Sequence, residues 1–132
     1  MKIEDHLRNI NESLEVINES IQKGLLERQR NISFNISVVS VEMLEVFLHN
    51  LSILNFGSSI KHDWFSSERK ALEKLKFDFP RKNEIINLLS DIESKRNIFC
   101  YGKPQPIEDI KSLLESFNKL KGLFEKEGLK WN

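Results

Sequence analysis

The sequence predicts an all-α fold: an up-and-down four-helix bundle with one additional short helix, in a single domain over residues 1–132. Two observations lead to this prediction. Apolar residues recur at helical spacing in four long segments, and glycine, proline or serine separates these segments. A chain of 132 residues is also long enough to bury a core of its own without a disulfide or a structural metal.

The first segment has the most regular pattern. Its apolar residues alternate steps of four and three and therefore share one face of a helix: Ile3, Leu7, Ile10, Leu14, Ile17 and Ile21. Polar and acidic residues occupy the remaining positions, and Gly24 is expected to end the helix. We expect the apolar face to pack on the core; a dimer seam is the alternative use of such a face.

The second segment, residues 31–54, is apolar on nearly every side, which favours a central helix enclosed by the others. Its β-branched stretch "ISVVSVEML" resembles a strand in isolation, but the length of the segment favours a helix. Ser33, Ser37 and Ser40 recur at helical spacing and allow a neighbouring helix to approach closely. Glu42 and Glu45 either mark the exposed line of this helix, or Glu42 pairs with a basic group of a neighbouring helix or subunit.

The second half of the chain predicts a loop and three further helices. Residues 55–67 are expected to form the loop, and Ser66 or Ser67 to cap a short helix of about three turns. A longer helix is expected from near Pro80 to about Tyr101, and a last one from Pro106 to Gly128.

Composition and motifs exclude several classes of function. The 20 basic and 20 acidic residues cancel, so any nucleic-acid contact requires a local basic patch. The single cysteine fits a reducing compartment, and the polar N-terminus and the lack of a long apolar run predict a soluble, cytoplasmic protein with no membrane contact. There is no Gly-rich phosphate loop and no paired Cys or His at metal spacing, so we expect no cofactor and no metal.

The stretch "ESKRNIFCYGKPQP", residues 93–106, contains the one residue that helical periodicity does not explain. Arg96 follows Ile92 and precedes Phe99 on the apolar face, where an arginine needs partners or a route to solvent. If the second and fourth helices are antiparallel neighbours, the basic residues at one end of the bundle are gathered there: Arg28, Arg30, Lys95, Arg96 and Lys103. Such an end is suited to contact RNA or a nucleotide phosphate.

The helix order and the motif "RNIFCYG" resemble the HEPN domain family, all-α proteins that are often dimers and are often paired with a minimal nucleotidyltransferase in toxin–antitoxin modules. Arg96, Tyr101 and Gly102 match the fixed positions of an Arg-x-x-x-Asp-Tyr-Gly version of the family motif, with Asn97 and Gly102 in the turn of the motif and Cys100 in place of the aspartate. The resemblance implies a homodimer, RNA or a nucleotidyltransferase as partner, and Arg96 as the residue that contacts the anion. It also implies that Tyr101 is either an orienting hydroxyl or an acceptor of modification by the partner enzyme.

The chain departs from the ribonuclease members of the family, in which four to six residues separate the arginine from a following histidine. Tyr101, Gly102 and Lys103 occupy the corresponding positions, and neither tyrosine nor lysine titrates near neutral pH. We therefore expect a binding or regulatory module. A divergent ribonuclease that uses Arg96 with Tyr101 or a distant histidine is the first alternative, and a purely structural interaction protein is the second.

The three histidines are expected to lie apart from this motif. His6 and His49 are predicted to be surface or boundary residues of their helices. His62, in "KHDW", is predicted to lie in a loop at the end of the bundle remote from Arg96, with Trp64 and Phe65 covering the base of the core.

Overall fold

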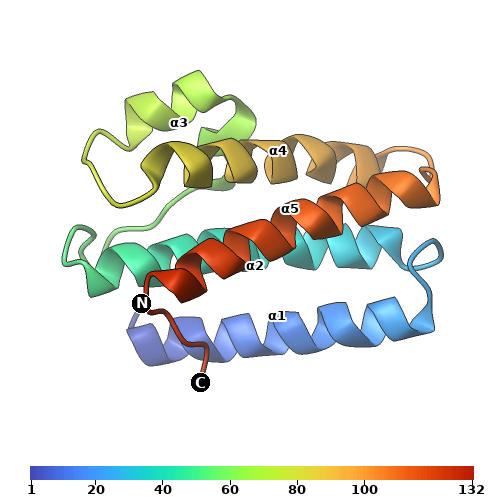
Figure 1. Cartoon of the computed structure of the whole chain (residues 1–132), viewed down its shortest axis with the longest axis horizontal. Helices are drawn as coiled ribbons and strands as arrows, with labels where there is room; N and C mark the ends of the chain where they lie inside the picture. Colours follow the sequence, from blue (N-terminus) through green and yellow to red (C-terminus); the bar gives the residue numbers. More distant parts are fainter.

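The computed structural model describes residues 1–132 and confirms the all-α fold. Four long helices run side by side along the long axis, and one short helix lies on the outer side of the third of them (Figure 1). The elements are α1 (Ile3–Lys23), α2 (Gln29–Asn50), the 3-10 helix η1 (His62–Ser66), α3 (Glu68–Lys74), α4 (Lys82–Tyr101) and α5 (Ile107–Lys126).

Helix α2 is the centre of the bundle, as its apolar sequence predicts. It packs against α1, α4 and α5, and its fully buried side chains include Ile32, Ile36, Val39, Met43 and Leu44. By length and composition alone α2 could also cross a membrane, but 78% of its apolar window is buried inside the bundle. This burial is what a core helix requires.

The apolar face of α1 packs against α2. Ile10 and Ile17 are buried, Leu7, Leu14 and Ile21 are half-buried against the same core, and Ile3 is half-buried at the start of the helix. Gly24 ends the helix at φ 135°, a backbone conformation that favours glycine. The expectation that this face packs on the core is therefore met within one chain.

The end of α2 and the loop that follows it differ from the prediction. Helix α2 ends at Asn50 and does not continue to Leu54, because Ser52 adopts a left-handed φ of 58° and the chain turns back. The N–H groups of Ile53 and Leu54 then both bond to the Leu48 carbonyl, at 3.0 and 3.3 Å. The segment 55–67 is likewise not all loop, because it contains η1.

Helix α3 is shorter than expected, Glu68–Lys74, but begins at a predicted cap. The Ser67 hydroxyl accepts a hydrogen bond from the Lys70 N–H at 3.0 Å. Phe65, just before it, is 1% exposed and covers the core as the sequence predicts.

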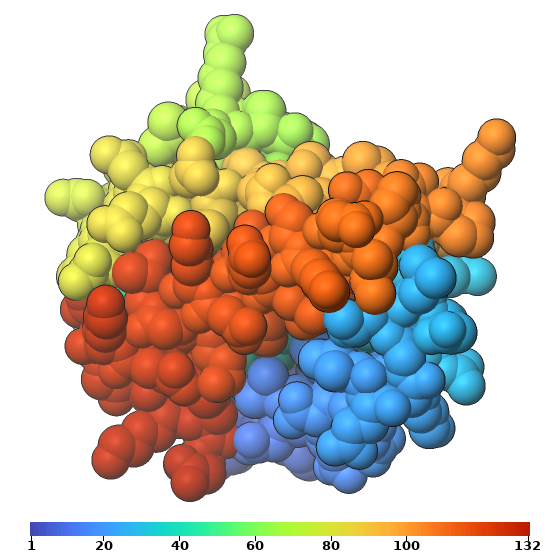
Figure 2. Space-filling view, turned by 45° about the vertical axis from the view of Figure 1, so that its right-hand side comes forward, coloured from blue at the N-terminus to red at the C-terminus, as the bar shows by residue number.

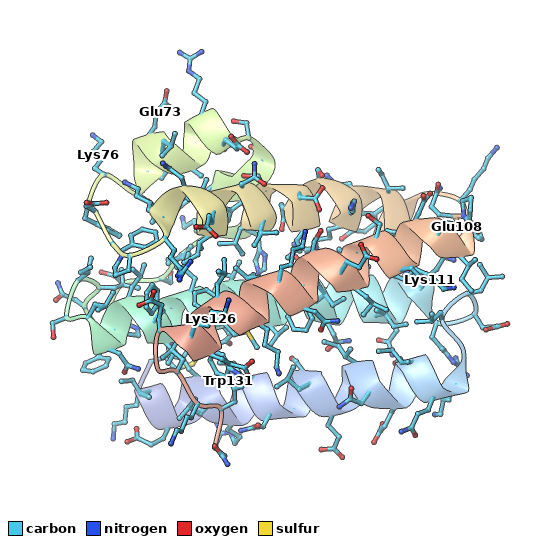
Figure 3. The ribbon with its side chains drawn as sticks, viewed as in Figure 1. Glu73, Lys76, Glu108, Lys111, Lys126 and Trp131 are labelled. Carbon is cyan, nitrogen blue, oxygen red and sulfur yellow. The ribbon has the colours of Figure 1, made fainter.

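The C-terminal residues fold back beneath α5 toward α1, where Trp131 lies between the two helices (Figure 3). The Trp131 indole N–H donates to Glu125 at 3.2 Å, and its carbonyl accepts from Asn11 of α1. The ring meets Phe124 edge-on at 6.4 Å between centroids. This segment fastens α5 to α1 at the end of the bundle where both chain termini lie (Figure 1).

Candidate functional site

The start of α2 and the end of α4 lie side by side and enclose a hollow of about 390 Å³. Figure 2, turned so that this end comes forward, shows the light-blue start of α2 beside the orange residues that follow α4. The antiparallel pairing that the basic-end hypothesis required is therefore present. We call this feature the α2–α4 hollow; its lining is Glu27, Arg28, Arg30, Asn31, Phe34, Cys100 and Tyr101.

Gln29 fixes the hollow by joining α2 to the turn after α4. Its side-chain oxygen accepts from the Gln105 N–H at 2.7 Å, and its side-chain nitrogen donates to the Gln105 carbonyl at 3.1 Å. The Cys100 thiol also lies 3.9 Å from the Arg30 carbonyl. Cys100 is buried, which fits a packing role.

Arg28 and Arg30 are the two arginines without a carboxylate partner. The other four arginines each form an ion pair: Arg8 with Asp5, Arg69 with Glu73, Arg81 with Glu84 and Glu127, and Arg96 with Glu93. Arg28 and Arg30 are exposed and line the hollow together. Glu27 is the single carboxylate of the lining, so the hollow carries a local excess of positive charge.

Arg96 lies next to this hollow on α4, and its side chain is only 20% exposed. The guanidinium carbon is 5.6 Å from the centre of the Phe34 ring, and Nη1 is 3.5 Å from Glu93 Oε1. Its buried Nε has no hydrogen-bond partner. Arg96 is thus held between a carboxylate and an aromatic ring that itself lines the hollow, with one donor unused.

Glu93 connects Arg96 to a histidine that the sequence placed elsewhere. Its Oε2 accepts from the Ser37 hydroxyl at 3.0 Å and lies 3.4 Å from His62 Nδ1. The prediction that His62 lies at the remote end was wrong, because η1 returns the chain to the middle of α4. We call Ser37, His62, Glu93 and Arg96 the Glu93 cluster.

Burial opposes ionisation of Glu93, but its partners outweigh burial. The hydrogen bond and charge of His62, the Ser37 hydroxyl and the Arg96 charge together hold the pKa of Glu93 below its ordinary 4.5. The carboxylate is therefore ionised at neutral pH and shares its two oxygens between Arg96 and His62.

The remaining predicted site residues are not all gathered at the hollow. Lys95 turns toward α5, where Nζ contacts Asp91 Oδ2 and Ser112 Oγ, both at 3.1 Å. Lys103 and Asn97 are exposed and outside the lining, and Tyr101 is 72% exposed at its rim. A side chain at Gly102 would meet the Ile98 carbonyl at 2.6 Å, so glycine is required where α4 ends.

A larger hollow of about 570 Å³ lies between α4 and α5 and contains none of these residues. Its lining is mostly serine and acidic side chains. The most central carboxylate, Asp91, is already bound by Lys95 at 3.1 Å and by the Ser116 hydroxyl at 2.8 Å. Lys119 is the one basic residue of this lining, beside the three carboxylates of Glu68, Asp91 and Glu115, so the groove has no excess of positive charge.

The structure also brings together two histidines that the sequence predicted to be surface or boundary residues. His6 is 2% and His49 6% exposed, and both lie beside Glu45 at the junction of α1 and α2. The prediction was wrong because α1 packs against the part of α2 that carries Glu42 and Glu45, and Glu42 bonds His6 as the pairing alternative proposed. We call His6, Glu45 and His49 the His6–His49 cluster.

The comparisons with known proteins find no matching family model, no similar curated protein and no similar solved structure.

Proposed function

We propose that the chain is a HEPN-like helical binding module that contacts RNA through the α2–α4 hollow. The observation that supports this proposal most is the pair of unpaired arginines, Arg28 and Arg30, in one hollow with the aromatic side chains Phe34 and Tyr101. A guanidinium group can donate two parallel hydrogen bonds to the oxygens of one phosphate, and exposed aromatic rings stack on unpaired bases. Each nucleotide of single-stranded RNA carries both partners, a phosphate group and a base, within a few ångströms of each other.

Arg96 contributes the third cation of this site. Its ion pair with Glu93 is long at 3.5 Å and its side chain is 20% exposed, so a phosphate oxygen can engage the guanidinium without breaking a tight bond. Phe34 limits the guanidinium to one orientation beside the hollow. The resemblance of "RNIFCYG" to the HEPN motif assigns the anion contact to the same residue.

The proposal includes the partners that the resemblance implies: a second copy of the chain and a minimal nucleotidyltransferase in a cytoplasmic toxin–antitoxin pair. Tyr101 supports an acceptor role because its ring is 72% exposed and its hydroxyl makes no hydrogen bond within the chain. Transfer of a nucleotide would join the phenolic oxygen to the α-phosphate of a nucleoside triphosphate and release pyrophosphate. Mass spectrometry after incubation with the enzyme of a neighbouring gene tests this, with Tyr101→Phe expected to remain unmodified.

RNA binding is tested by fluorescence anisotropy with a labelled single-stranded oligonucleotide. The Arg28→Gln/Arg30→Gln double variant is expected to bind at least about tenfold more weakly and to lower the salt dependence by about 0.7 per lost phosphate contact. Arg69→Gln is the matched control, because Arg69 is an exposed arginine on α3 outside the hollow. Equal loss in the control and the double variant, or no binding by the wild type, would overturn the proposal.

A divergent ribonuclease is the second candidate, and the Glu93 cluster favours it. Glu93 positions His62 Nδ1 at 3.4 Å and Arg96 at 3.5 Å, so the imidazole missing from the motif is supplied by η1. A carboxylate-oriented histidine can take the 2′-hydroxyl proton of RNA, and an arginine can stabilise the charge that develops on the phosphate. This arrangement requires no metal ion.

Cleavage is tested with the same oligonucleotide and its 2′-deoxy counterpart. If the chain is a ribonuclease, His62→Asn and Arg96→Ala each lower the rate by at least about 100-fold, and the deoxy substrate is not cleaved. Equal activity in wild type and both variants would identify a contaminating nuclease and leave the binding module as the function.

A further inference from the structure

The His6–His49 cluster lies at the opposite end of α2 from the α2–α4 hollow and has a different chemistry. From Phe34 to Glu45 the helix rises about 16 Å, at about 1.5 Å per residue. We propose that the Nε2 atoms of His6 and His49 and the carboxylate of Glu45 bind a divalent zinc ion that joins α1 to α2. This inference goes beyond the proposed RNA contact and does not depend on it.

The three side chains converge from two helices. One ligand atom from each residue lies within 4.8 Å of the other two, and His6 Nε2 is 4.0 Å from Glu45 Oε2. Zinc bonds of about 2.0–2.2 Å place tetrahedral ligands about 3.4 Å apart, so the ligands must draw together by about an ångström. Small rotations of three side chains provide that movement without a shift of either helix.

The outer hydrogen bonds leave both Nε2 atoms free to bind. The carbonyl oxygen of Leu54 can only accept, so His49 Nδ1 must donate the hydrogen bond of 2.8 Å that joins them. The Glu42 carboxylate likewise bonds His6 Nδ1. With the proton on Nδ1, each neutral imidazole presents a lone pair on Nε2, the arrangement found in zinc-binding histidines.

The free nitrogens are the independent sign of a missing ligand. His6 Nε2 and His49 Nε2 are both buried and both lack a hydrogen-bond partner, in side chains that are more than nine-tenths buried. Buried polar atoms without partners are rare in folded proteins. A single cation between them and Glu45 satisfies both nitrogens and the carboxylate.

Particular residues position the groups that bond to the Nδ1 atoms of His6 and His49. The turn at Ser52, just after α2 ends at Asn50, brings the Leu54 carbonyl back onto His49. Asn9, one turn after His6, donates to the other oxygen of Glu42 at 3.2 Å and holds that carboxylate in place. Phe56 covers His49, with 4.9 Å between ring centroids.

The donor set identifies the metal class. Two imidazole nitrogens and one carboxylate suit zinc and the neighbouring first-row ions, whereas calcium and magnesium require mainly oxygen ligands. Three protein ligands leave the fourth zinc position for a water molecule. Because the ligands come from α1 and α2, the ion would stabilise the folded chain by binding it and not the unfolded chain.

Metal-free wild-type protein, prepared with EDTA and dialysed, is titrated with Zn²⁺ against a chromophoric chelator. We expect one equivalent to bind and the melting temperature to rise. His6→Gln and His49→Gln should each weaken binding at least about 100-fold, and Glu42→Gln by about tenfold through the outer contact. His62→Gln is the matched control, since it removes the only histidine outside the cluster and should keep the wild-type affinity.

A measurement on the wild type alone tests the proposal even if the variants fail to fold. In ¹H–¹⁵N spectra of the imidazoles, one equivalent of Zn²⁺ should move the Nε2 resonances of two histidines and leave the third unchanged. Co²⁺ in place of Zn²⁺ should give the visible absorption of a four-coordinate ion. The proposal is overturned if the folded wild type binds less than one equivalent, or if His62→Gln weakens binding as much as His49→Gln.

Discussion

The molecule contains two histidine–glutamate clusters, and they differ in whether the imidazoles reach solvent or are buried with a nitrogen that lacks a partner. In the Glu93 cluster both carboxylate oxygens have partners, and His62 retains 31% exposure. In the His6–His49 cluster the imidazoles are buried and each has one nitrogen without a partner. Similar residue types therefore form an ion-pair group with a partly exposed histidine in one place and a buried, incomplete ligand set in the other.

The carboxyl groups respond in opposite directions. Burial raises the pKa of Glu45 above 4.5, and although the charge of His6 lowers it, the nearby Glu42 raises it further. At Glu93 the partners outweigh burial, and the pKa is lowered. The two glutamate side chains are similarly buried, so the opposite directions come from the partners, which are stronger at Glu93.

The largest expected effect on folding stability comes from loss of the buried hydrogen bond between Glu42 and His6. Glu42→Ala leaves both nitrogens of the buried His6 without a partner, which costs about 1–3 kcal/mol of folding stability in metal-free protein. Glu93→Ala removes a comparable carboxylate, but His62 and Arg96 are partly exposed and can be hydrated, so it should cost less than about 1 kcal/mol. Urea unfolding in EDTA measures both.

Glu42→Gln is the control for this comparison, because its amide oxygen can still accept from His6 Nδ1. It should recover most of the stability lost in Glu42→Ala. A larger loss in Glu93→Ala than in Glu42→Ala would mean that the exposed cluster, and not the buried one, carries the greater stability.

The next largest effect is the part of the pH dependence of folding stability that comes from Glu93. Its pKa is lower in the folded than in the unfolded chain, so its contribution to stability is present above the unfolded value and is lost as pH falls through the folded value. The stability difference between wild type and Glu93→Gln should therefore be largest near neutral pH and shrink as the pH falls below 4.5. Urea titrations across that range test the sign; a gap that widens on acidification contradicts it.

The sequence predicted the helices better than the clusters. Periodicity places α1, and the uniformly apolar sequence of α2 predicts its central position, because both properties follow from burial of the segment itself. Gly24, Ser67 and Gly102 are found at helix ends as predicted, because capping and φ preferences are local. The antiparallel pairing of α2 with α4 was only a condition of the basic-end hypothesis, and the structure meets it.

The contacts of the histidines depend on tertiary structure that no local pattern encodes. His6 and Glu42 meet across two helices, and His62 reaches Glu93 only because η1 follows a turn after α2. Lys95 lies one position from Arg96, yet helical geometry turns it to α5. One signal was available in the sequence: Glu45 and His49 are spaced i, i+4, which puts both side chains on one face of α2.

The smallest expected effect concerns the two exposed aromatic rings that lie beside the clusters, Phe34 next to Arg96 and Phe56 next to His49. Phe34 lies 5.6 Å from the Arg96 guanidinium carbon at a partly exposed site, where a cation–π contact contributes about 0.5–1 kcal/mol. A double-mutant cycle of Phe34→Leu and Arg96→Met, followed by urea unfolding, should give a coupling of about 0.5 kcal/mol. Phe56→Leu, which removes the ring beside His49, should give no coupling with Arg96→Met.

If Phe34 also orients Arg96 for phosphate, Phe34→Leu should weaken RNA binding about twofold or more, whereas Phe56→Leu should leave it unchanged. Loss of affinity in both variants would show that these rings act through general stability and not through Arg96.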